Sequence, residues 1–217
     1  MIIAIDGPAG AGKSTVARWL AKELGFVYID TGAMYRALTL KALEISLNLE
    51  DAASLVKMSE DTELDISNKP DGSIMICLDG RDVSRAIRSP RITQYVSDIA
   101  KIKGVRSTML QLQRALGRAN DSVLDGRDIG TVVFPDADKK FYIDAKFNER
   151  VRRRFKELER AGVKITKGAV SADLKNRDSI DSTRSYAPLK KADDAICIDT
   201  TNMTIGEVVK MMLKEIG

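Results

Sequence analysis

Short runs of apolar residues alternate along the chain with longer stretches in which apolar residues recur at helical spacing. The short runs are nearly free of charge and do not alternate with polar residues, a pattern typical of strands buried on both faces of a parallel sheet. We expect such strands at Ile2–Ile5, Phe26–Ile29, Ser122–Leu124, Lys140–Ile143 and Ala195–Ile198. Regular alternation of strand and helix predicts an α/β fold, a central parallel sheet flanked by helices.

The helical stretches follow the predicted strands. We expect helices at Gly12–Leu24, Ala33–Leu47, Arg91–Ala100, Val105–Ala119, Asn148–Ala161, Ala172–Thr183 and Ile205–Ile216. The first of them ends before Gly25, a residue type that readily takes the left-handed backbone found just past helix ends.

One segment departs from this alternation. Glu63–Ser67 and Ser73–Leu78 alternate apolar and polar residues around the turn-forming stretch Lys69–Gly72, which predicts a β-hairpin. We interpret the hairpin as an insertion that stands off the parallel core. The alternative is a hairpin that extends the edge of the main sheet.

Composition excludes several classes of site. The 217 residues include no histidine, so a Ser-His-Asp triad and any metal site built on histidine are excluded. The net charge of +4, from 35 Lys and Arg against 31 Asp and Glu, is too mild to indicate a dedicated nucleic-acid-binding protein.

Cys77 and Cys197 lie in apolar runs, and we expect both to be buried, reduced thiols of a cytoplasmic protein. No apolar run reaches the roughly 18 residues of a membrane span, and the chain opens on a predicted strand without a targeting segment.

The strongest motif lies between the first predicted strand and the first predicted helix. Gly7-Pro-Ala-Gly-Ala-Gly-Lys-Ser14 matches the phosphate-loop pattern. Glycines allow the tight turn that brings successive N–H groups onto phosphate oxygens, and the helix that follows adds its positive N-terminus. Lys13 would contact the outer phosphates, and the Ser14 hydroxyl would complete the shell of a Mg²⁺ ion. We predict a nucleoside-triphosphate site made of Gly7, Pro8, Ala9, Gly10, Ala11, Gly12, Lys13, Ser14 and Thr15.

Arginines follow two other predicted strands. Arg36 closes the segment Asp30–Arg36, and Arg127 lies in the segment Asp125–Thr131. Residues just past the carboxyl ends of parallel strands line the ligand crevice of an open sheet. We therefore predict a second substrate that carries a phosphate. We interpret Asp125 as the acidic residue that holds Mg²⁺ through water; its alternative role is to cap a turn.

Two further basic segments fit the same chemistry. The helix around Arg150–Arg160 leads into a polar loop, and we interpret it as a lid over the triphosphate rather than as a solvated face. Arg177, Asp181 and Arg184 are spaced four and three apart, which predicts that they share one helix face. Phosphoryl transfer depends on positioning and on cations around the transferred group, so the lack of an obvious base is no objection.

Three other functions use a phosphate loop. A regulatory GTPase needs a base-reading Asn-Lys-x-Asp element, and the matching letters at Asn68–Asp71 fall in the predicted hairpin turn. A kinase of another small metabolite, such as shikimate, would keep the chemistry and change the acceptor. A nucleic-acid-dependent ATPase would use the basic helix as its binding patch, and its ATP turnover would respond to RNA or DNA.

Together the motifs resemble one family, the bacterial cytidylate kinases, over essentially the whole chain. The resemblance rests on Ile5–Ser14, Asp30–Arg36, Asp125–Pro135 and Ala187–Leu189. It implies a P-loop fold with a five-stranded parallel sheet and Mg²⁺-dependent transfer of a phosphoryl group from ATP to CMP or dCMP. It also implies a core of residues 1–61, 91–151 and 171–217, a monophosphate-binding insertion at 62–90 and a mobile lid at 152–170. We expect a monomer with no nucleic-acid or membrane partner.

The resemblance also implies roles for single residues. Arg36 and Arg127 would bind the monophosphate, and Lys13, Asp125, Arg127 and Arg153 would form the catalytic set, with Arg153 closing onto the ATP phosphates. The residues implied for CMP binding are Thr31, Arg36, Ser97, Arg106, Arg127, Asp128, Arg177, Asp181 and Arg184. Within this set Ser97, Arg106 and Asp128 would read the cytosine edge, because a carboxylate can accept from the cytosine amino group. Asp128 has the alternative role of holding Arg127 as an ion-pair partner. Thr31 stands where some family members carry serine, so the resemblance leaves the choice between CMP and dCMP open.

Overall fold

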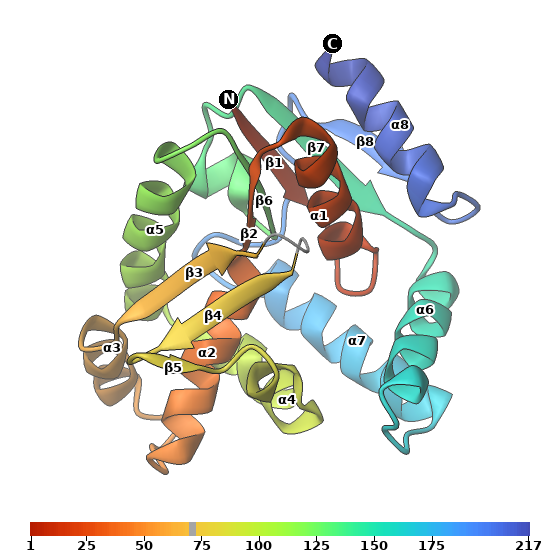
Figure 1. Cartoon of the computed structure of the whole chain (residues 1–217). Helices are drawn as coiled ribbons and strands as arrows, with labels where there is room; N and C mark the ends of the chain where they lie inside the picture. The colour runs from red at the N-terminus through yellow and green to blue at the C-terminus, as the bar shows by residue number, and fades with distance from the viewer. Residues whose placement is uncertain (70–72) are drawn as a thin grey trace.

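A computed structural model describes residues 1–69 and 73–217 of the chain. Its main sheet has five parallel strands in the order β2-β6-β1-β7-β8. Their bounds are β1 Ile2–Asp6, β2 Val27–Asp30, β6 Ser122–Gly126, β7 Lys139–Asp144 and β8 Ile196–Asp199. All five predicted strands are present, and the predicted α/β class is confirmed (Figure 1).

The order of the strands determines where a ligand crevice opens. The connection that leaves β1 goes to β2 on one side of it, and the connection that leaves β6 goes to β7 on the other side. A crevice opens where adjacent parallel strands send their connections in opposite directions. In the register of β1 against β6, Asp6 lies opposite Gly126. The phosphate loop and the segment after Gly126 therefore leave the sheet side by side.

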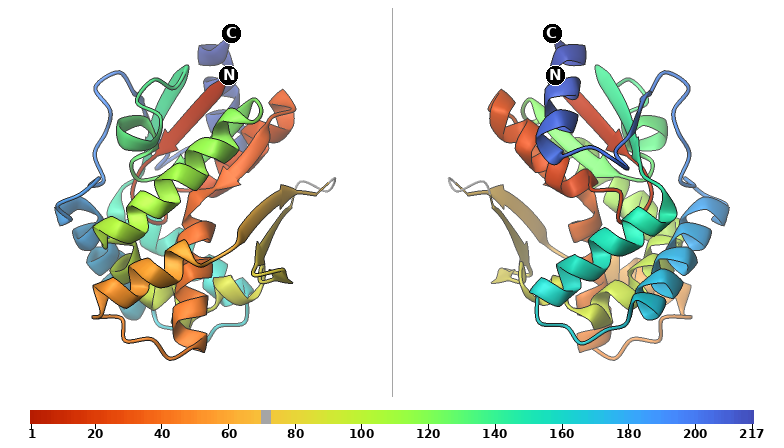
Figure 2. Two further views of the ribbon diagram at one scale, coloured as in Figure 1. Left: turned by 90° about the vertical axis from the view of Figure 1, so that its left-hand side faces the viewer. Right: turned by 90° about the vertical axis from the view of Figure 1, so that its right-hand side faces the viewer.

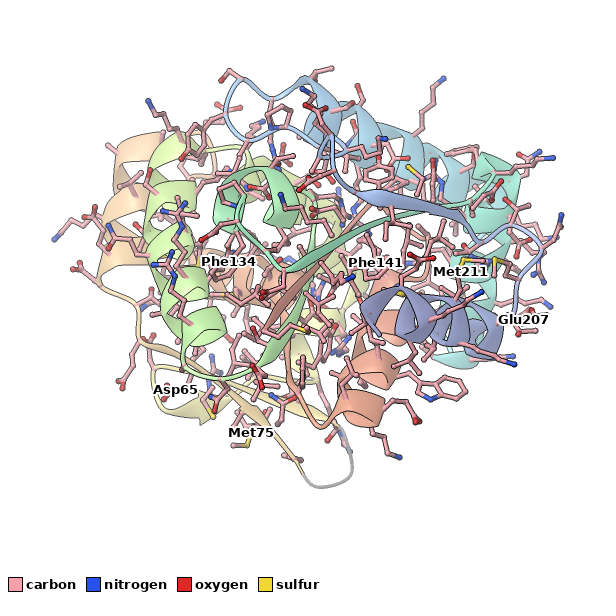
Figure 3. The ribbon with its side chains drawn as sticks, turned by 90° about the horizontal axis from the view of Figure 1, so that it is seen from above. Asp65, Met75, Phe134, Phe141, Glu207 and Met211 are labelled. Carbon is pink, nitrogen blue, oxygen red and sulfur yellow. The ribbon has the colours of Figure 1, made fainter. Side chains whose placement is uncertain are left out.

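Helices cover both faces of this sheet and its carboxyl edge. Their bounds are α1 Lys13–Leu24, α2 Thr31–Glu44, α3 Ala52–Glu60, α4 Pro90–Ala100, α5 Lys103–Arg118, α6 Phe147–Arg160, α7 Lys167–Thr183 and α8 Ile205–Ile216. Helices α1 and α8 pack together on one face, and α5 lies on the other (Figures 1 and 3). Phe134 and Phe141, labelled in Figure 3, are buried in the interior between these layers.

The predicted hairpin forms a sheet of its own. Strands β3 Leu64–Asn68, β4 Ile74–Leu78 and β5 Arg81–Asp82 pair antiparallel, and Figure 2 shows them projecting from the body. The alternative of an edge hairpin on the main sheet is wrong. Part of the predicted turn, residues 70–72, lies outside the described residues. Asn68 is a residue of β3, and its side-chain amide exchanges hydrogen bonds with the Tyr28 backbone, at 3.1 and 3.0 Å. It belongs to the hairpin sheet and does not follow a strand of the main sheet, as a base-reading element would.

Several local predictions were less accurate. The helix predicted at 172–183 begins earlier, at Lys167, because Thr166 caps it by accepting a hydrogen bond from the Ala169 N–H. A π-helical turn, η2 at Ile129–Val133, and a short 3-10 turn, η1 at Ala86–Arg88, were not predicted. Both cysteines are free, but neither is fully buried: Cys197, on the edge strand β8, is exposed and Cys77 is half-buried. Along the described ranges 1–69 and 73–217, no helix is long and apolar enough to span a membrane.

Candidate active site

The phosphate loop turns between β1 and α1. Gly7 has a φ of 148°, and a Cβ atom there would lie 1.9 Å from the backbone oxygen of Ile143. Gly12, with a φ of 96°, is the residue directly before α1. Both positions require glycine, so the motif's two glycines are explained by backbone shape and by contact with β7.

A partly buried ion pair holds the tip of the loop. Arg150 of α6 donates to the Ala9 carbonyl at 2.9 Å and to the Asp178 carboxylate at 2.5 Å. The other oxygen of Asp178 accepts from the Ala9 N–H at 3.1 Å. Arg150, at the start of the basic segment 150–160, therefore contacts both the phosphate loop and α7.

Lys13 is almost fully buried beneath the loop. Its Nζ donates to the Pro8 carbonyl at 2.7 Å. Burial, followed by the charge of Arg127, lowers the pKa of Lys13 to about 7. A triphosphate on the loop would restore the charged form, since a nearby anion favours an ammonium ion.

Ser14 and Asp125, the two residues predicted to hold Mg²⁺, lie in hydrogen-bond contact. Ser14 Oγ donates to Asp125 Oδ2 at 2.8 Å, and the buried Tyr28 hydroxyl donates to Oδ1 at 2.7 Å. Thr31 Oγ1 donates to the backbone oxygen of Asp125 at 2.7 Å. Burial raises the pKa of Asp125. Within the described residues no three acidic or cysteine side chains gather closely enough to hold a metal ion by themselves.

Arg36 lies at the start of the second crossover. Asp30 caps α2 by accepting from the Ala33 N–H at 2.8 Å, and it also accepts from Arg36 Nη2 at 2.9 Å. Arg88 of η1 approaches the same carboxylate at 3.9 Å. Two guanidinium groups therefore share one buried carboxylate and keep N–H groups for another anion.

A second ion pair crosses the cleft. Arg127 Nε donates to Asp181 Oδ2 at 2.8 Å, so the partner of Arg127 is Asp181 and not Asp128. Burial raises the pKa of Asp181, but the charges of Arg127 and Arg184 outweigh it and the net shift is downward. Arg177, one turn before Asp181, has its pKa lowered to about 10 by burial and by Arg127. The cleft thus concentrates positive charge that a bound anion would relieve.

Asp128 lies between two other arginines. Its Oδ2 accepts from Arg106 Nη2 at 2.5 Å, and its Oδ1 lies 3.5 Å from Arg184 Nη2. All three side chains are less than a tenth exposed. Arg184 does not share the helix face of Asp181 as predicted, because α7 ends at Thr183 and Arg184 has extended backbone. It still reaches Asp181 at 3.7 Å.

Arg153 reaches the loop from α6. It donates to Thr200 Oγ1 at 2.9 Å and to the Ala11 carbonyl at 3.3 Å. Glu149 accepts from Arg153 at 2.9 Å, and hydrogen bonds from Arg152 and then Arg153 lower the pKa of Glu149 to about 2. Arg153 therefore lies beside the phosphate loop, where the triphosphate is predicted to bind.

One cleft of about 1170 Å³ unites these groups. Among the described residues it is lined by thirteen Lys and Arg side chains against six Asp and Glu. Every residue predicted for the two substrates lines it except Gly7 and Pro8. Buried guanidinium nitrogens without a hydrogen-bond partner gather there, and they belong to Arg18, Arg36, Arg106, Arg154, Arg177 and Arg184. The excess of positive over negative side chains along its walls makes this cleft suited to ligands that carry several negative charges.

The cleft also contains residues that sequence reasoning missed. Tyr35 packs its ring 5.3 Å from the Arg106 guanidinium, and Thr200 donates to the Ala11 carbonyl at 3.3 Å. Tyr35 lies within the segment Asp30–Arg36, so its motif could have indicated it. Thr200 follows the last strand at the carboxyl edge of the sheet, where position alone predicts a site residue.

Comparison with known proteins agrees with this geometry. A family model described as cytidylate kinase matches residues 3–217. A cytidylate kinase from Caldanaerobacter subterraneus subsp. tengcongensis is 49% identical over 99% of this chain and 93% of the relative. One from Fusobacterium nucleatum subsp. nucleatum is 48% identical over 100% of this chain and 97% of the relative.

Solved structures show the same fold at low identity. An uncharacterized protein from Eubacterium ventriosum matches with a TM-score of 0.54 at 16% identity, covering 100% of this chain and 98% of that one. A shikimate kinase from Bacteroides thetaiotaomicron matches with a TM-score of 0.50 at 10% identity, with the same coverage. These likenesses concern the fold alone.

Proposed function

Because the chain belongs to the cytidylate kinase family, we propose that its cleft binds ATP and CMP together and transfers the γ-phosphoryl group to CMP, and likewise to dCMP. The observation that carries this proposal is the excess of Lys and Arg over Asp and Glu side chains, thirteen against six, along a cleft that begins at the phosphate loop. Two phosphate-bearing substrates would balance this excess of positive charge. Guanidinium groups suit this task, since they bind phosphate oxygens with paired, charge-assisted hydrogen bonds.

ATP would lie on the loop Gly7–Thr15. Its phosphates would accept from the backbone N–H groups of the loop and from Lys13, which exchanges the Pro8 carbonyl for a phosphate oxygen. Arg153, beside the loop, would contact the same phosphates. Ser14 and Asp125 would hold a Mg²⁺ ion, which when bound neutralises the phosphates and orients them.

CMP would lie across the cleft from the loop. Arg36 and Arg127 would bind its phosphate, and Arg177 and Asp181, with Thr31, would lie along its sugar. Ser97, buried on α4, would face the base together with Arg106 and Asp128. Arg184 completes this wall through its contacts with Asp128 and Asp181.

Transfer would then need no protein base. A CMP phosphate oxygen, already ionised, attacks the γ-phosphorus as the bond from that phosphorus to the bridging oxygen of ADP breaks. Lys13, Arg127 and Arg153 would stabilise charge on the equatorial oxygens, the dominant contribution in such reactions. Exclusion of water by a closed cleft would protect ATP from hydrolysis.

The moving parts belong to the same proposal. We assign the insertion at 62–90 to monophosphate binding and the segment 152–170 to a lid, with the core at 1–61, 91–151 and 171–217. The separate sheet of β3, β4 and β5 supports the first assignment. The arginines of α6 that line the cleft support the second. We propose that the chain works as a cytoplasmic monomer on these small molecules, without a nucleic-acid partner.

Arg36→Met tests the phosphate assignment, with Lys41→Met as its matched control. Both residues lie on α2, but Lys41 pairs with Asp79 at 2.7 Å and does not line the cleft. Loss of a charge-assisted bond costs about 1.5–3 kcal/mol, so we expect Arg36→Met to raise the KM for CMP at least tenfold. The KM for ATP should stay within twofold. Equal effects of the two variants would contradict the assignment.

A further inference from the structure

The segment after β6 forms an uncommon turn beneath Asp128. Residues Ile129–Val133 make the π-helical turn η2, and Asp128 is the residue directly before it. The Asp128 carbonyl accepts from the N–H groups of Val132 and Val133, at 2.9 and 3.1 Å. Any shift of this turn therefore moves the backbone that carries the Asp128 side chain.

One buried carboxylate holds the start of the turn. Asp6 Oδ1 accepts from the Ile129 N–H at 2.8 Å, and Oδ2 accepts from the Gly130 N–H at 2.7 Å. These are the first N–H groups of the turn, which have no partner within it. Asp6 is 4% exposed and ends β1, directly before the phosphate loop.

A guanidinium group holds the other end. Arg114 of α5 donates from Nη2 to the Val132 carbonyl and from Nε to the Val133 carbonyl, both at 2.9 Å. Arg106, two turns earlier on the same helix, donates to the Asp128 carboxylate. Helix α5 therefore holds both the side chain of Asp128 and the turn that carries it.

We propose that Asp6 and Arg114 are positioning residues that fix η2 at its two ends and so aim Asp128 at the cytosine base. Neither side chain lines the cleft, so they act through Asp128 and touch no substrate. This inference rests on the proposed function, in which Asp128 reads the base. On this inference, the preference for cytosine also depends on two residues outside the cleft, one on β1 and one on α5.

The test compares Arg114→Met with Arg118→Met, a matched control one turn further along α5. Arg118 is exposed and lies 5.9 Å from the Phe134 ring without a hydrogen bond to η2. A 1 Å misplacement of a reacting group can cost about a hundredfold, and for a smaller shift of Asp128 we expect about tenfold. Arg114→Met should raise the KM for CMP and lower the preference for CMP over UMP by that factor. The KM for ATP should stay within twofold, and Arg118→Met should change none of these values by more than twofold.

Three further variants separate positioning from general damage. Arg114→Lys keeps one donor and should give an intermediate preference. Asp6→Asn keeps one acceptor and should lower the preference in the same direction. Adding Arg114→Met to Asp128→Ala should change the preference less than twofold, because a residue that acts through Asp128 has no effect without it.

The results that overturn the inference are specific. The inference is wrong if Arg114→Met behaves like Arg118→Met, or if it lowers activity on CMP and on UMP equally. It is also wrong if the effect of Arg114→Met on the preference for CMP persists in the Asp128→Ala background. Failure of the proposed function would look different. In that case the wild-type chain would not phosphorylate CMP, or Asp128→Ala alone would leave the preference unchanged.

Discussion

Replacement of Asp128 by alanine is the most informative single change in the cleft. The carboxylate accepts a hydrogen bond from Arg106 at 2.5 Å and lies 3.5 Å from Arg184. Cytosine offers an amino donor where uracil offers a carbonyl acceptor. A carboxylate therefore favours cytosine and repels uracil, and its removal should narrow the difference between CMP and UMP.

The change should affect two quantities, the preference for CMP over UMP and the stability of the fold. A hydrogen bond to a charged group contributes about 1.5–3 kcal/mol, which corresponds to a tenfold to 150-fold loss in kcat/KM for CMP relative to UMP. Removing one partner of a buried ion pair costs about 3–5 kcal/mol of stability. We expect the lower end, because Arg184 also contacts Asp181 and the Ala187 carbonyl. About 3 kcal/mol lowers the Tm of a chain this size by roughly 6–12 °C.

The assay measures kcat/KM for CMP and UMP by ADP release, at a temperature well below the Tm of the variant. Asp128→Asn is the matched control, since its amide keeps one oxygen acceptor and removes the charge. It should retain more of the preference than Asp128→Ala. Equal losses on CMP and UMP would refute the base-reading role and leave Asp128 as an ion-pair partner of Arg106 and Arg184.

Three other predictions address the phosphate loop. Lys13→Ala should lower turnover by about two to three orders of magnitude with the fold retained by circular dichroism; near-normal turnover would contradict the ATP site. The pKa of Lys13 is about 7 in the folded chain, against an ordinary value of 10.5. Between pH 7 and pH 10.5 the unfolded chain therefore binds one more proton than the folded chain, and the free energy of unfolding rises with pH in this range. Urea unfolding should show wild type gaining stability relative to Lys13→Met from about pH 7 to pH 10, and parallel curves would contradict the shift. Ser14→Ala should raise the Mg²⁺ concentration for half-maximal activity about tenfold, and an unchanged Mg²⁺ titration would remove Ser14 from the metal site.

The sequence predicted the parallel sheet because its strands are short, apolar and followed by helices. Their order could not be predicted from periodicity, since the pattern of β6 is that of any buried strand. The hairpin was found because its polar positions alternate, and its independence from the main sheet depends on long-range packing. The start of α7 was missed because its cap, Thr166, lies within a polar loop with no apolar periodicity.

The phosphate loop and the cleft arginines were found because each follows a strand or belongs to a motif. Their pairing was not predictable. Arg127 pairs with Asp181, 54 positions away in the chain, and not with its neighbour Asp128. The supports at Asp6 and Arg114 were missed for the same reason, because their function depends on backbone groups of a turn that has no sequence signature.

The central claim is that the cleft joins ATP to a cytidine monophosphate. It is tested most directly by ADP release from ATP and Mg²⁺ with CMP, dCMP, UMP, AMP, GMP and shikimate, each supplied alone and at equal concentration. We expect turnover with CMP and dCMP, weak turnover with UMP and none with the rest. Turnover with AMP or shikimate in preference to CMP, or ADP release that no acceptor increases, would contradict it.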